Sequence, residues 1–166
     1  MNFLISLKEF KNYLFKKENI LFFVFAVIIF FLDRMSKLQI IKNLNEVPYF
    51  VNDYINFDLI WNTGIGFGLL STNLSLLYNL VTTLIGTIII LIIYFFILSN
   101  KIDKFIYSII VGGALGNFYD RIVYKAVPDF IDLHYDNFHW FTFNVADIFI
   151  TMGIFIYILK SFIVKN

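Results

Sequence analysis

Cysteine is absent from the 166 residues of this chain. Its absence excludes a disulfide framework, a thiol nucleophile and thiolate metal sites. Charged residues are also scarce, at 15% of the chain, and none occurs between Asp58 and Lys101. The sequence has no internal repeat, low-complexity tract or linker rich in proline and glycine. We therefore expect one domain over residues 1–166.

Apolar residues make up 60% of the chain, aromatic residues make up 20%, and the mean hydropathy is +0.79. This composition is too apolar for a soluble domain of this length. Four apolar runs are each close to the ~20 residues that an α-helix needs to cross ~30 Å of hydrocarbon. They cover residues 20–41, 74–98, 104–122 and 145–164. The predicted fold is a membrane all-α bundle of four transmembrane helices.

Three segments lie outside these runs. Residues 43–72 contain the only stretch that looks like β-structure, because aromatic and β-branched residues mix there with Asn, Asp and Pro48. We expect a small extracytoplasmic β-sheet there, and a loop or short helix in the second outer connection. In residues 1–18, apolar residues recur at helical spacing with lysines between them, which predicts an amphipathic helix on the cytoplasmic leaflet.

Lysine and arginine predict the orientation in the membrane, since short loops rich in these residues stay in the cytoplasm. If the four helices alternate in direction, eight of these residues fall on one side and five on the other. The larger group is Lys8, Lys11, Lys16, Lys17, Lys101, Lys104, Lys160 and Lys165. Both termini are therefore predicted to be cytoplasmic, and the two long connections face outward.

Nine of the twelve acidic residues lie in residues 33–58 and 120–147, next to the apolar runs. Asp33, Asp120 and Asp147 each end or begin a predicted helix, all on the outer side. A carboxylate at the edge of hydrocarbon is costly to keep, so several of them indicate a functional site.

The third apolar run contains Gly113, Gly116, Asn117, Asp120 and Arg121, three or four residues apart. This spacing places them on one helix face. Glycines on such a face are also typical of simple helix packing in membranes. The polar residues that follow must find partners inside the protein, which indicates that the face points inward.

Two further candidates are Asn144 with Asp147, at the start of the last run, and Asp129, which follows Pro128 in the second connection. The alternative interpretation is that Asn144 or Asp147 only caps the helix, as these residue types often do. Two carboxylates about 3 Å apart would repel by roughly 5 kcal/mol at an effective dielectric of about 20, so they would share one proton. One could then activate water while the other protonates a peptide carbonyl, with Asn62, Asn117, Asn144 and Arg121 as hydrogen-bond donors to the developing oxyanion or the substrate backbone. The residues alone do not choose between Asp120 and Asp129 as the partner of Asp147.

Four blocks of this sequence resemble the lipoprotein signal peptidases, also called signal peptidase II. The blocks are Phe31 to Lys37, Asn62-Thr63-Gly64, the glycine-containing run from Gly112 to Arg121, and Phe143 to Asp147. The resemblance implies a catalytic pair at Asp129 and Asp147. It implies supporting roles for Asp33, Asn62, Gly64, Asn117, Asp120, Arg121 and Asn144. Gly66 departs from the family, which more often has alanine there.

The resemblance further implies an aspartic endopeptidase that removes signal peptides from diacylglyceryl-modified prolipoproteins. We expect it in the bacterial cytoplasmic membrane with its active site on the outer face, as a monomer among membrane lipids. It would be inhibited by globomycin, and would need no cofactor, metal or nucleic acid.

Three other interpretations compete with this one. His134 and His139, near Asp129, Asp132 and Asp136, suggest a metal site, but the sequence has no His-Glu-x-x-His helix to support it. Acids in a membrane protein could also serve a small ion or proton carrier. A structural subunit would be favoured if Asp129 and Asp147 proved dispensable.

Overall fold

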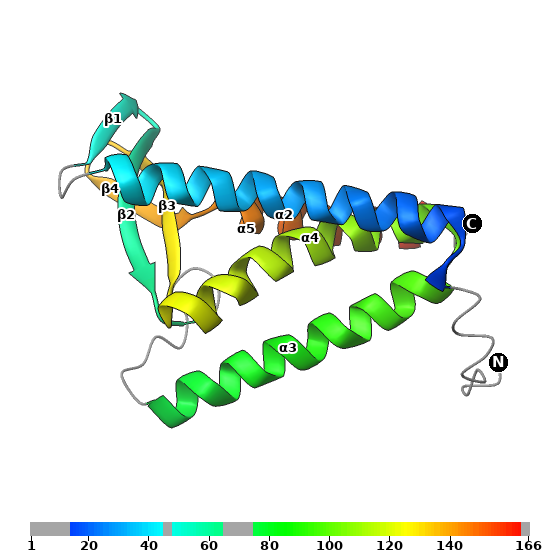
Figure 1. Ribbon diagram of the computed structural model, residues 1–166. Helices are drawn as coiled ribbons and strands as arrows, with labels where there is room; N and C mark the ends of the chain where they lie inside the picture. Colours follow the sequence, from blue (N-terminus) through cyan, green and yellow to red (C-terminus); the bar gives the residue numbers. More distant parts are fainter. Residues whose placement is uncertain (1–13, 45–47, 65–74, 164–166) are drawn as a thin grey trace.

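The computed structural model describes residues 14–44, 48–64 and 75–163. It contains four long helices, α2 (Lys17–Asn43), α3 (Ser75–Leu98), α4 (Lys101–Tyr124) and α5 (Val145–Ile163). A small sheet lies at one end of them (Figure 1). Residues 1–13, which hold most of the predicted amphipathic helix, lie outside the described residues, as do residues 45–47 and 65–74 of the predicted β-like segment and its Gly66.

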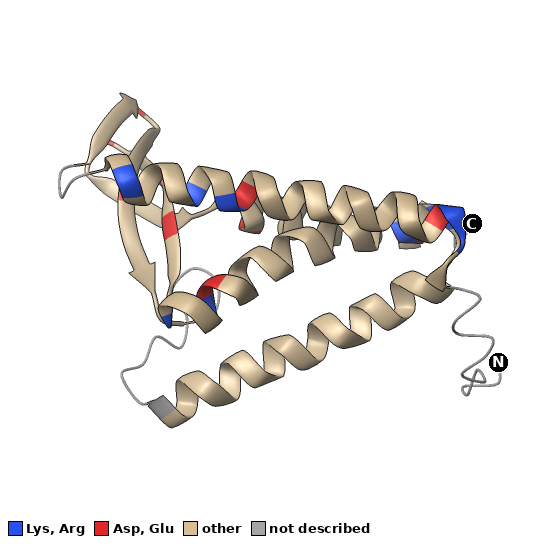
Figure 2. Ribbon diagram, viewed as in Figure 1, with Lys and Arg blue, Asp and Glu red and all other residues tan. Residues whose placement is uncertain are grey.

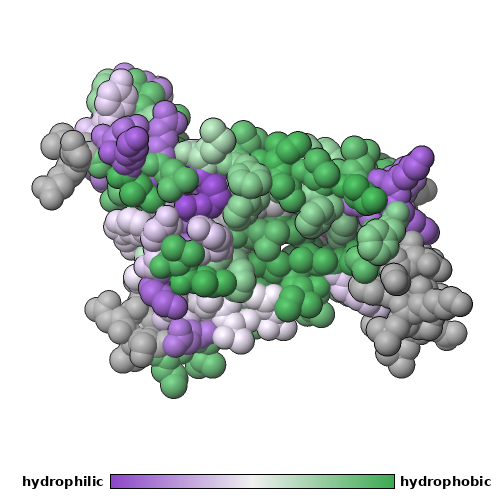
Figure 3. Space-filling view, in the orientation of Figure 1, coloured by the Kyte–Doolittle hydropathy of each residue, from purple (hydrophilic) through white to green (hydrophobic). Residues whose placement is uncertain are grey.

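Three of the described helices are long and apolar enough to cross a membrane, namely α2, α3 from Leu76, and α5. They expose many large apolar side chains, which suits a lipid environment. Apolar residues cover the helices in Figure 3, whereas hydrophilic residues gather at the two ends. These helices confirm three of the predicted runs as candidate spans.

The remaining predicted run, residues 104–122, corresponds to α4, which carries five charged residues. It packs against α2, α3 and α5, and twelve of its residues are buried, among them Lys104, Asp120 and Arg121. Because these residues face the neighbouring helices, their polar groups can find partners without meeting lipid. That α4 also crosses the bilayer stays a prediction.

Close contact between helices depends on glycines in α4. A Cβ atom on Gly112 would lie 2.7 Å from the carbonyl oxygen of Ala26 in α2. A Cβ atom on Gly113 would lie 2.6 Å from the carbonyl oxygen of Ala146 in α5. Neither position has room for a side chain, so α4 approaches both neighbours along its backbone. The packing interpretation of these glycines is therefore correct.

The sheet contains strands from both outer connections. Its order is β1 (Tyr49–Asn52), β2 (Ile55–Asn62), β3 (Val127–Tyr135) and β4 (Phe138–Phe143), and each neighbouring pair is antiparallel. The strands β1 and β2 confirm a sheet within residues 43–72. The expectation that only this segment is β-like was wrong, because the second connection forms a hairpin instead of a loop or helix.

The hairpin has a physical basis that is visible in the sequence. Residues from Val127 to Tyr135 are rich in aromatic and branched apolar types, and residues from Phe138 to Phe143 are mostly aromatic. A two-residue turn joins them, and its first residue, Asp136, has a φ of 50°. The polar residues Asp129, Asp132 and His134 obscured the β pattern, yet all three are buried.

Charged residues gather toward the two ends of the helices, and the middle of the bundle has few (Figure 2). The start of α2 and the end of α5 lie together at the end opposite the sheet (Figure 1). This arrangement agrees with the start of α2 and the end of α5 lying on the same side of a membrane. Their assignment to the cytoplasm stays a prediction.

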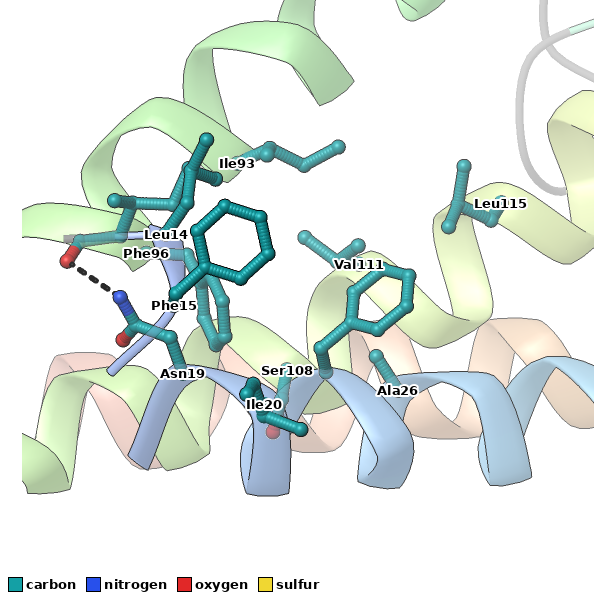
Figure 4. A pocket seen from close by; sticks show the side chains of 12 residues that line it. Leu14, Phe15, Asn19, Ile20, Ala26, Ile93, Phe96, Ser108, Val111 and Leu115 are labelled. Carbon is teal, nitrogen blue, oxygen red and sulfur yellow. Dashed lines mark hydrogen bonds between the residues drawn. The ribbon is translucent and has the colours of Figure 1, made fainter. Parts of the chain in front are cut away.

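An apolar cavity of about 370 Å³ lies between α2, α3 and α4. It is near the end of the bundle where α2 begins and α3 ends, and Figure 4 shows Asn19 at its edge. The Asn19 side chain donates a hydrogen bond of 3.3 Å to the carbonyl oxygen of Ile97. None of the described residues that line the cavity is charged. The cavity therefore offers no acid or base and lies apart from the carboxylates at the other end.

We expect Gly113→Ala to lower the free energy of unfolding by about 1–3 kcal/mol, because the added methyl group would push α5 away. The matched control is Gly86→Ala, whose Cβ would lie 3.0 Å from ring atoms of Phe118, a side chain that can shift. Thermal unfolding in detergent would compare the two variants. Equal melting temperatures would show that the α4–α5 contact tolerates a side chain.

Candidate active site

Asp129 lies on β3 and is 3% exposed. Each of its carboxylate oxygens accepts a hydrogen bond from an asparagine amide. Asn62, the last residue of β2, donates to Oδ2 over 2.8 Å, and Asn144, just before α5, donates to Oδ1 over 2.6 Å. Three separate segments therefore fix one carboxylate, which the sequence alone had placed in a loop.

Asp147 lies in the first turn of α5 and is partly exposed. Its Oδ1 accepts a hydrogen bond of 2.7 Å from the side-chain amide of Asn117 in α4. Its Oδ2 accepts one of 3.2 Å from the backbone N–H of Asn144, and the Asn144 side chain accepts one of 3.1 Å from the backbone N–H of Asp147. This reciprocal pair is a capping box.

The capping box answers the question that the sequence left open. Asn144 and Asp147 do cap α5, but the amide nitrogen of Asn144 is still free to hold Asp129. The two acids that the resemblance paired are therefore both bonded to one residue. The structure does not pair Asp120 with Asp147 in this way, since its partners lie elsewhere.

Lys37 in α2 is fully buried and contacts three side chains. Its Nζ lies 2.8 Å from an oxygen of Asp33, 2.8 Å from an oxygen of Asp120, and 2.7 Å from Oδ1 of Asn117. The contact with Asn117 fixes which end of that amide accepts, so the nitrogen end must point at Asp147. Lys37 thereby orients the donor that holds the second carboxylate.

Asp33 joins α2 to the start of α5. Its Oδ1 accepts a hydrogen bond of 2.8 Å from the backbone N–H of Ala146, while its Oδ2 meets Lys37. A Cβ atom on Gly116 would lie only 2.3 Å from Oδ2 of Asp33. Gly116 therefore leaves the space beside α4 that the Asp33 carboxylate occupies.

Asp120 forms an ion pair with Arg34 as well as with Lys37. Arg34 also donates a hydrogen bond of 3.2 Å to the hydroxyl of Tyr124, and its guanidinium lies 4.6 Å from the centre of the Tyr119 ring. The resemblance implied a supporting role for Asp120. Asp120 reaches Asn117 only through Lys37, because it lies against α2.

Arg121 connects α4 to the segment that follows β2. Its guanidinium donates hydrogen bonds to the carbonyl oxygens of Gly64, at 2.8 Å, and Asn117, at 3.1 Å. The backbone N–H of Gly64 donates in turn to the side-chain oxygen of Asn62 over 2.8 Å. That contact leaves the amide nitrogen of Asn62 for Asp129. Arg121 and Gly64 therefore act on Asp129 indirectly.

All nine residues of the predicted site lie in one connected set of contacts, and two residues that the sequence did not single out belong to it. Lys37 and Arg34 had been counted as outer cations in the orientation argument. Asp33 and Lys37 are four residues apart in a predicted helix, which is the spacing of a helical ion pair. That spacing was the available signal for a buried pair.

The pKa of Asp129 is raised to about 6 from an ordinary value of 3.8, firstly by burial and secondly by the negative charge of Asp147. Hydrogen bonds from Asn62 and Asn144 oppose this rise in the pKa. The two acids are thus close enough for one charge to affect the protonation of the other. A carboxyl group with such a pKa can hold or release a proton near neutral pH.

A family model described as signal peptidase (SPase) II matches residues 25–163. The chain belongs to the signal peptidase II family. The match confirms the resemblance drawn from the four sequence blocks and identifies the chain as a peptidase of a bacterial membrane family.

Relatives in this family cover most of the chain. It is 50% identical over 146 residues to a lipoprotein signal peptidase of Pelagibacter ubique, with 86% of this chain and 88% of the relative covered. It is 33% identical over 155 residues to a lipoprotein signal peptidase of Francisella tularensis, with 87% and 93% covered. A solved structure described as a bacterial membrane enzyme is 30% identical, with a TM-score of 0.71 and 89% and 88% covered.

Replacing Lys37 by methionine should lower the free energy of unfolding of this signal peptidase II by about 3–5 kcal/mol, since Asp33 and Asp120 would lose a buried counter-charge. Lys42→Met is the matched control, because Lys42 lies on the same helix and is exposed. Thermal unfolding of both variants in detergent would measure the effect. If they unfolded at the same temperature, the Lys37 ammonium would not be stabilising the site.

Proposed function

We propose that this chain is an aspartic endopeptidase that removes the signal peptide from diacylglyceryl-modified prolipoproteins, with Asp129 and Asp147 as its catalytic pair. The observation that supports it best is Asn144, which bonds to both carboxylates from its position at the start of α5. Family membership supports the substrate class, because the relatives are lipoprotein signal peptidases.

In the proposed mechanism the two carboxyl groups share one proton. The deprotonated group takes a proton from a water molecule as the water attacks the peptide carbonyl carbon, and the protonated group gives its proton to the carbonyl oxygen. The tetrahedral intermediate then collapses, with a proton passing to the leaving amine. The raised pKa of Asp129 supports the presence of a shared proton near neutral pH.

The surrounding polar residues are proposed to orient the carboxylates. Asn62, Asn117 and Asn144 each direct an amide nitrogen at Asp129 or Asp147. The sequence had suggested these amides as donors to the substrate oxyanion. Since their donors already point at the two acids, we assign them to positioning. Fixed carboxylates need no rearrangement when charge develops in the transition state.

The position of the pair suits a substrate that is itself anchored in the membrane. Asp147 lies at the end of α5 that meets the sheet, and exposed aromatic residues such as Trp140 and Phe141 lie on β4. We propose that the acyl chains stay in hydrocarbon while the scissile bond reaches the outer interface. Aromatic side chains commonly lie at that level.

The remaining features of the proposal follow from the family resemblance and, for the termini, from the distribution of lysine and arginine. The enzyme is proposed to act as a monomer in the bacterial cytoplasmic membrane, with cytoplasmic termini and no cofactor in the reaction, and globomycin is expected to inhibit it. A proton or ion carrier is less suitable, because a relay needs acids at mid-membrane. Here Asp129 lies on the sheet and Asp147 at a helix end.

Asp129→Asn and Asp147→Asn should each lower kcat for cleavage of a lipid-modified precursor peptide by at least ~10²-fold, since the amide can neither take nor give the proton. Asp136→Asn is the matched control, because Asp136 is an exposed turn residue whose φ of 50° asparagine also tolerates. Cleavage would be followed by separating precursor from product, with globomycin as a further check. Normal cleavage by either dyad variant, in protein that melts like the wild type, would contradict the proposal.

The pH dependence should report the shared proton. Above the pKa of Asp129, which is about 6, the free enzyme loses that proton, so kcat/KM should fall as the pH rises through this value. The same group stabilises the fold at low pH, and this contribution is lost as the pH rises through about 6, because the folded state binds the proton more tightly than the unfolded chain.

Measurements of kcat/KM and melting temperature from about pH 5 to about pH 8 would test both effects. Asp129→Asn should have a smaller change of melting temperature over this range than the wild type. A value of kcat/KM that stays constant throughout would show that no shared proton is needed.

A further inference from the structure

The β3–β4 hairpin brings together three side chains that can bind metal ions, Asp132, His134 and His139. One possible ligand atom from each lies within 4.8 Å of the others. Nδ1 of His139 is 2.7 Å from Oδ2 of Asp132, and Nδ1 of His134 is 3.7 Å from the same oxygen. The two imidazole rings stack with 5.4 Å between their centres.

The strand pairing produces this cluster. His134 and His139 are directly opposite each other in the antiparallel pair, so their side chains emerge on the same face of the sheet. Asp132 precedes His134 by two residues and shares that face. A backbone hydrogen bond of 2.9 Å from His134 to the carbonyl oxygen of Tyr54 fixes the strand from the other side. The arrangement is therefore set by the backbone.

His134 has a ring nitrogen that a bound ion could use. Its residue is only 8% exposed, and Nδ1 has no hydrogen-bond partner within the part of the chain that the structure describes. The 3.7 Å separation from Asp132 is too long for a hydrogen bond. A buried ring nitrogen without a partner destabilises a protein. The carboxylate oxygen 3.7 Å from Nδ1 of His134 is Oδ2 of Asp132, which His139 already contacts.

We propose that Asp132, His134 and His139 form a binding site for a divalent transition-metal ion of the Zn²⁺ class. Ligand atoms ~2.0–2.1 Å from a tetrahedral Zn²⁺ ion lie ~3.3 Å from one another. The two separations from Asp132, 2.7 and 3.7 Å, lie on either side of that value, and all three ligand atoms lie within 4.8 Å of one another, so side-chain rotations would bring them to a common ion. Water would complete the coordination.

The ligand types determine the class of ion. Two imidazoles and one carboxylate suit Zn²⁺ and its neighbours in the first transition series, whereas Mg²⁺ and Ca²⁺ prefer sites made of oxygen. The sequence pattern disfavoured a metal site at His134 and His139 with Asp129, Asp132 and Asp136. The proposed site keeps three of these residues, whereas Asp129 faces Asn62 and Asn144 instead.

The proposed ion would link β3 to β4 and stabilise the hairpin. It would be held by none of the residues assigned to peptide hydrolysis, so its role is structural. Asp129 lies on the same strand as two of its ligands. A metal ion would therefore support the strand on which that carboxylate is placed.

The sequence makes a clean test possible, because the chain has only two histidines and no cysteine. The full chain, purified with a tag that lacks histidine, would be titrated with Zn²⁺ against a chromogenic chelator in detergent. Binding of one Zn²⁺ per chain is expected, together with a higher melting temperature. Mg²⁺ at the same concentration should leave the melting temperature unchanged.

His139→Ala should weaken Zn²⁺ binding at least ~10-fold, the minimum usually found when a metal site is disturbed. Its side chain is 58% exposed, so the variant should fold. The matched control is Asn137→Ala, an exposed position in the same turn. It should bind Zn²⁺ like the wild type.

A second variant, Asp132→Asn, keeps an oxygen near His139 but removes the charge, and should also weaken binding. With Co²⁺ as a probe, the wild type should show visible absorption bands that His139→Ala lacks. The proposal would be overturned if the wild type bound no Zn²⁺, if Mg²⁺ stabilised it equally, or if His139→Ala bound Zn²⁺ as tightly as the wild type.

Discussion

The buried ammonium group of Lys37 is the interaction on which the candidate site depends most. A charged group inside a protein costs several kcal/mol unless partners surround it. Lys37 has Asp33, Asp120 and the side-chain oxygen of Asn117 within 2.8 Å. These partners come from α2 and α4, so the charge can be buried only when the two helices are packed together. The packing in turn requires Gly116, which leaves space for Asp33.

Two sets of contacts extend from α4 to the paired carboxylates. One passes from Lys37 through Asn117 to Asp147, and the other passes from Arg121 through Gly64 and Asn62 to Asp129. In the first, the ammonium group of Lys37 determines which way the Asn117 amide points, and in the second the backbone N–H of Gly64 does so for Asn62. An amide has a donor end and an acceptor end, so fixing one end fixes the other. Positive charge can thus orient the acids without touching them.

The sequence was informative where a residue's chemistry conflicts with its surroundings. Acids and asparagines beside apolar runs were recognisable as site residues, because such groups need partners at the edge of a membrane. Composition and run length were enough for the helices. The resemblance to signal peptidase II was needed to select Asp129, since no local pattern separates it from Asp120.

The sequence was least informative where the role of a residue depends on a partner far away along the chain. Lys37 was counted only as a cation on the outer side, although its partner Asn117 is 80 residues away. The β3–β4 hairpin was missed because its buried polar residues, Asp129, Asp132 and His134, interrupt the apolar pattern of a strand. Each has a contact on the folded chain that the linear pattern does not contain. Long-range polar contacts therefore set the limit of what local patterns can predict.

Asn144 performs three separate tasks at the start of α5. One side chain starts α5 with its oxygen and holds Asp129 with its nitrogen, while its backbone N–H holds Asp147. The first turn of a helix is normally free to fray, but here fraying would separate the two acids. Because the proposed mechanism needs both carboxylates in place, local melting at Asn144 would stop it even while the bundle stays folded, so the lifetime of one helical turn limits the lifetime of the assembled site.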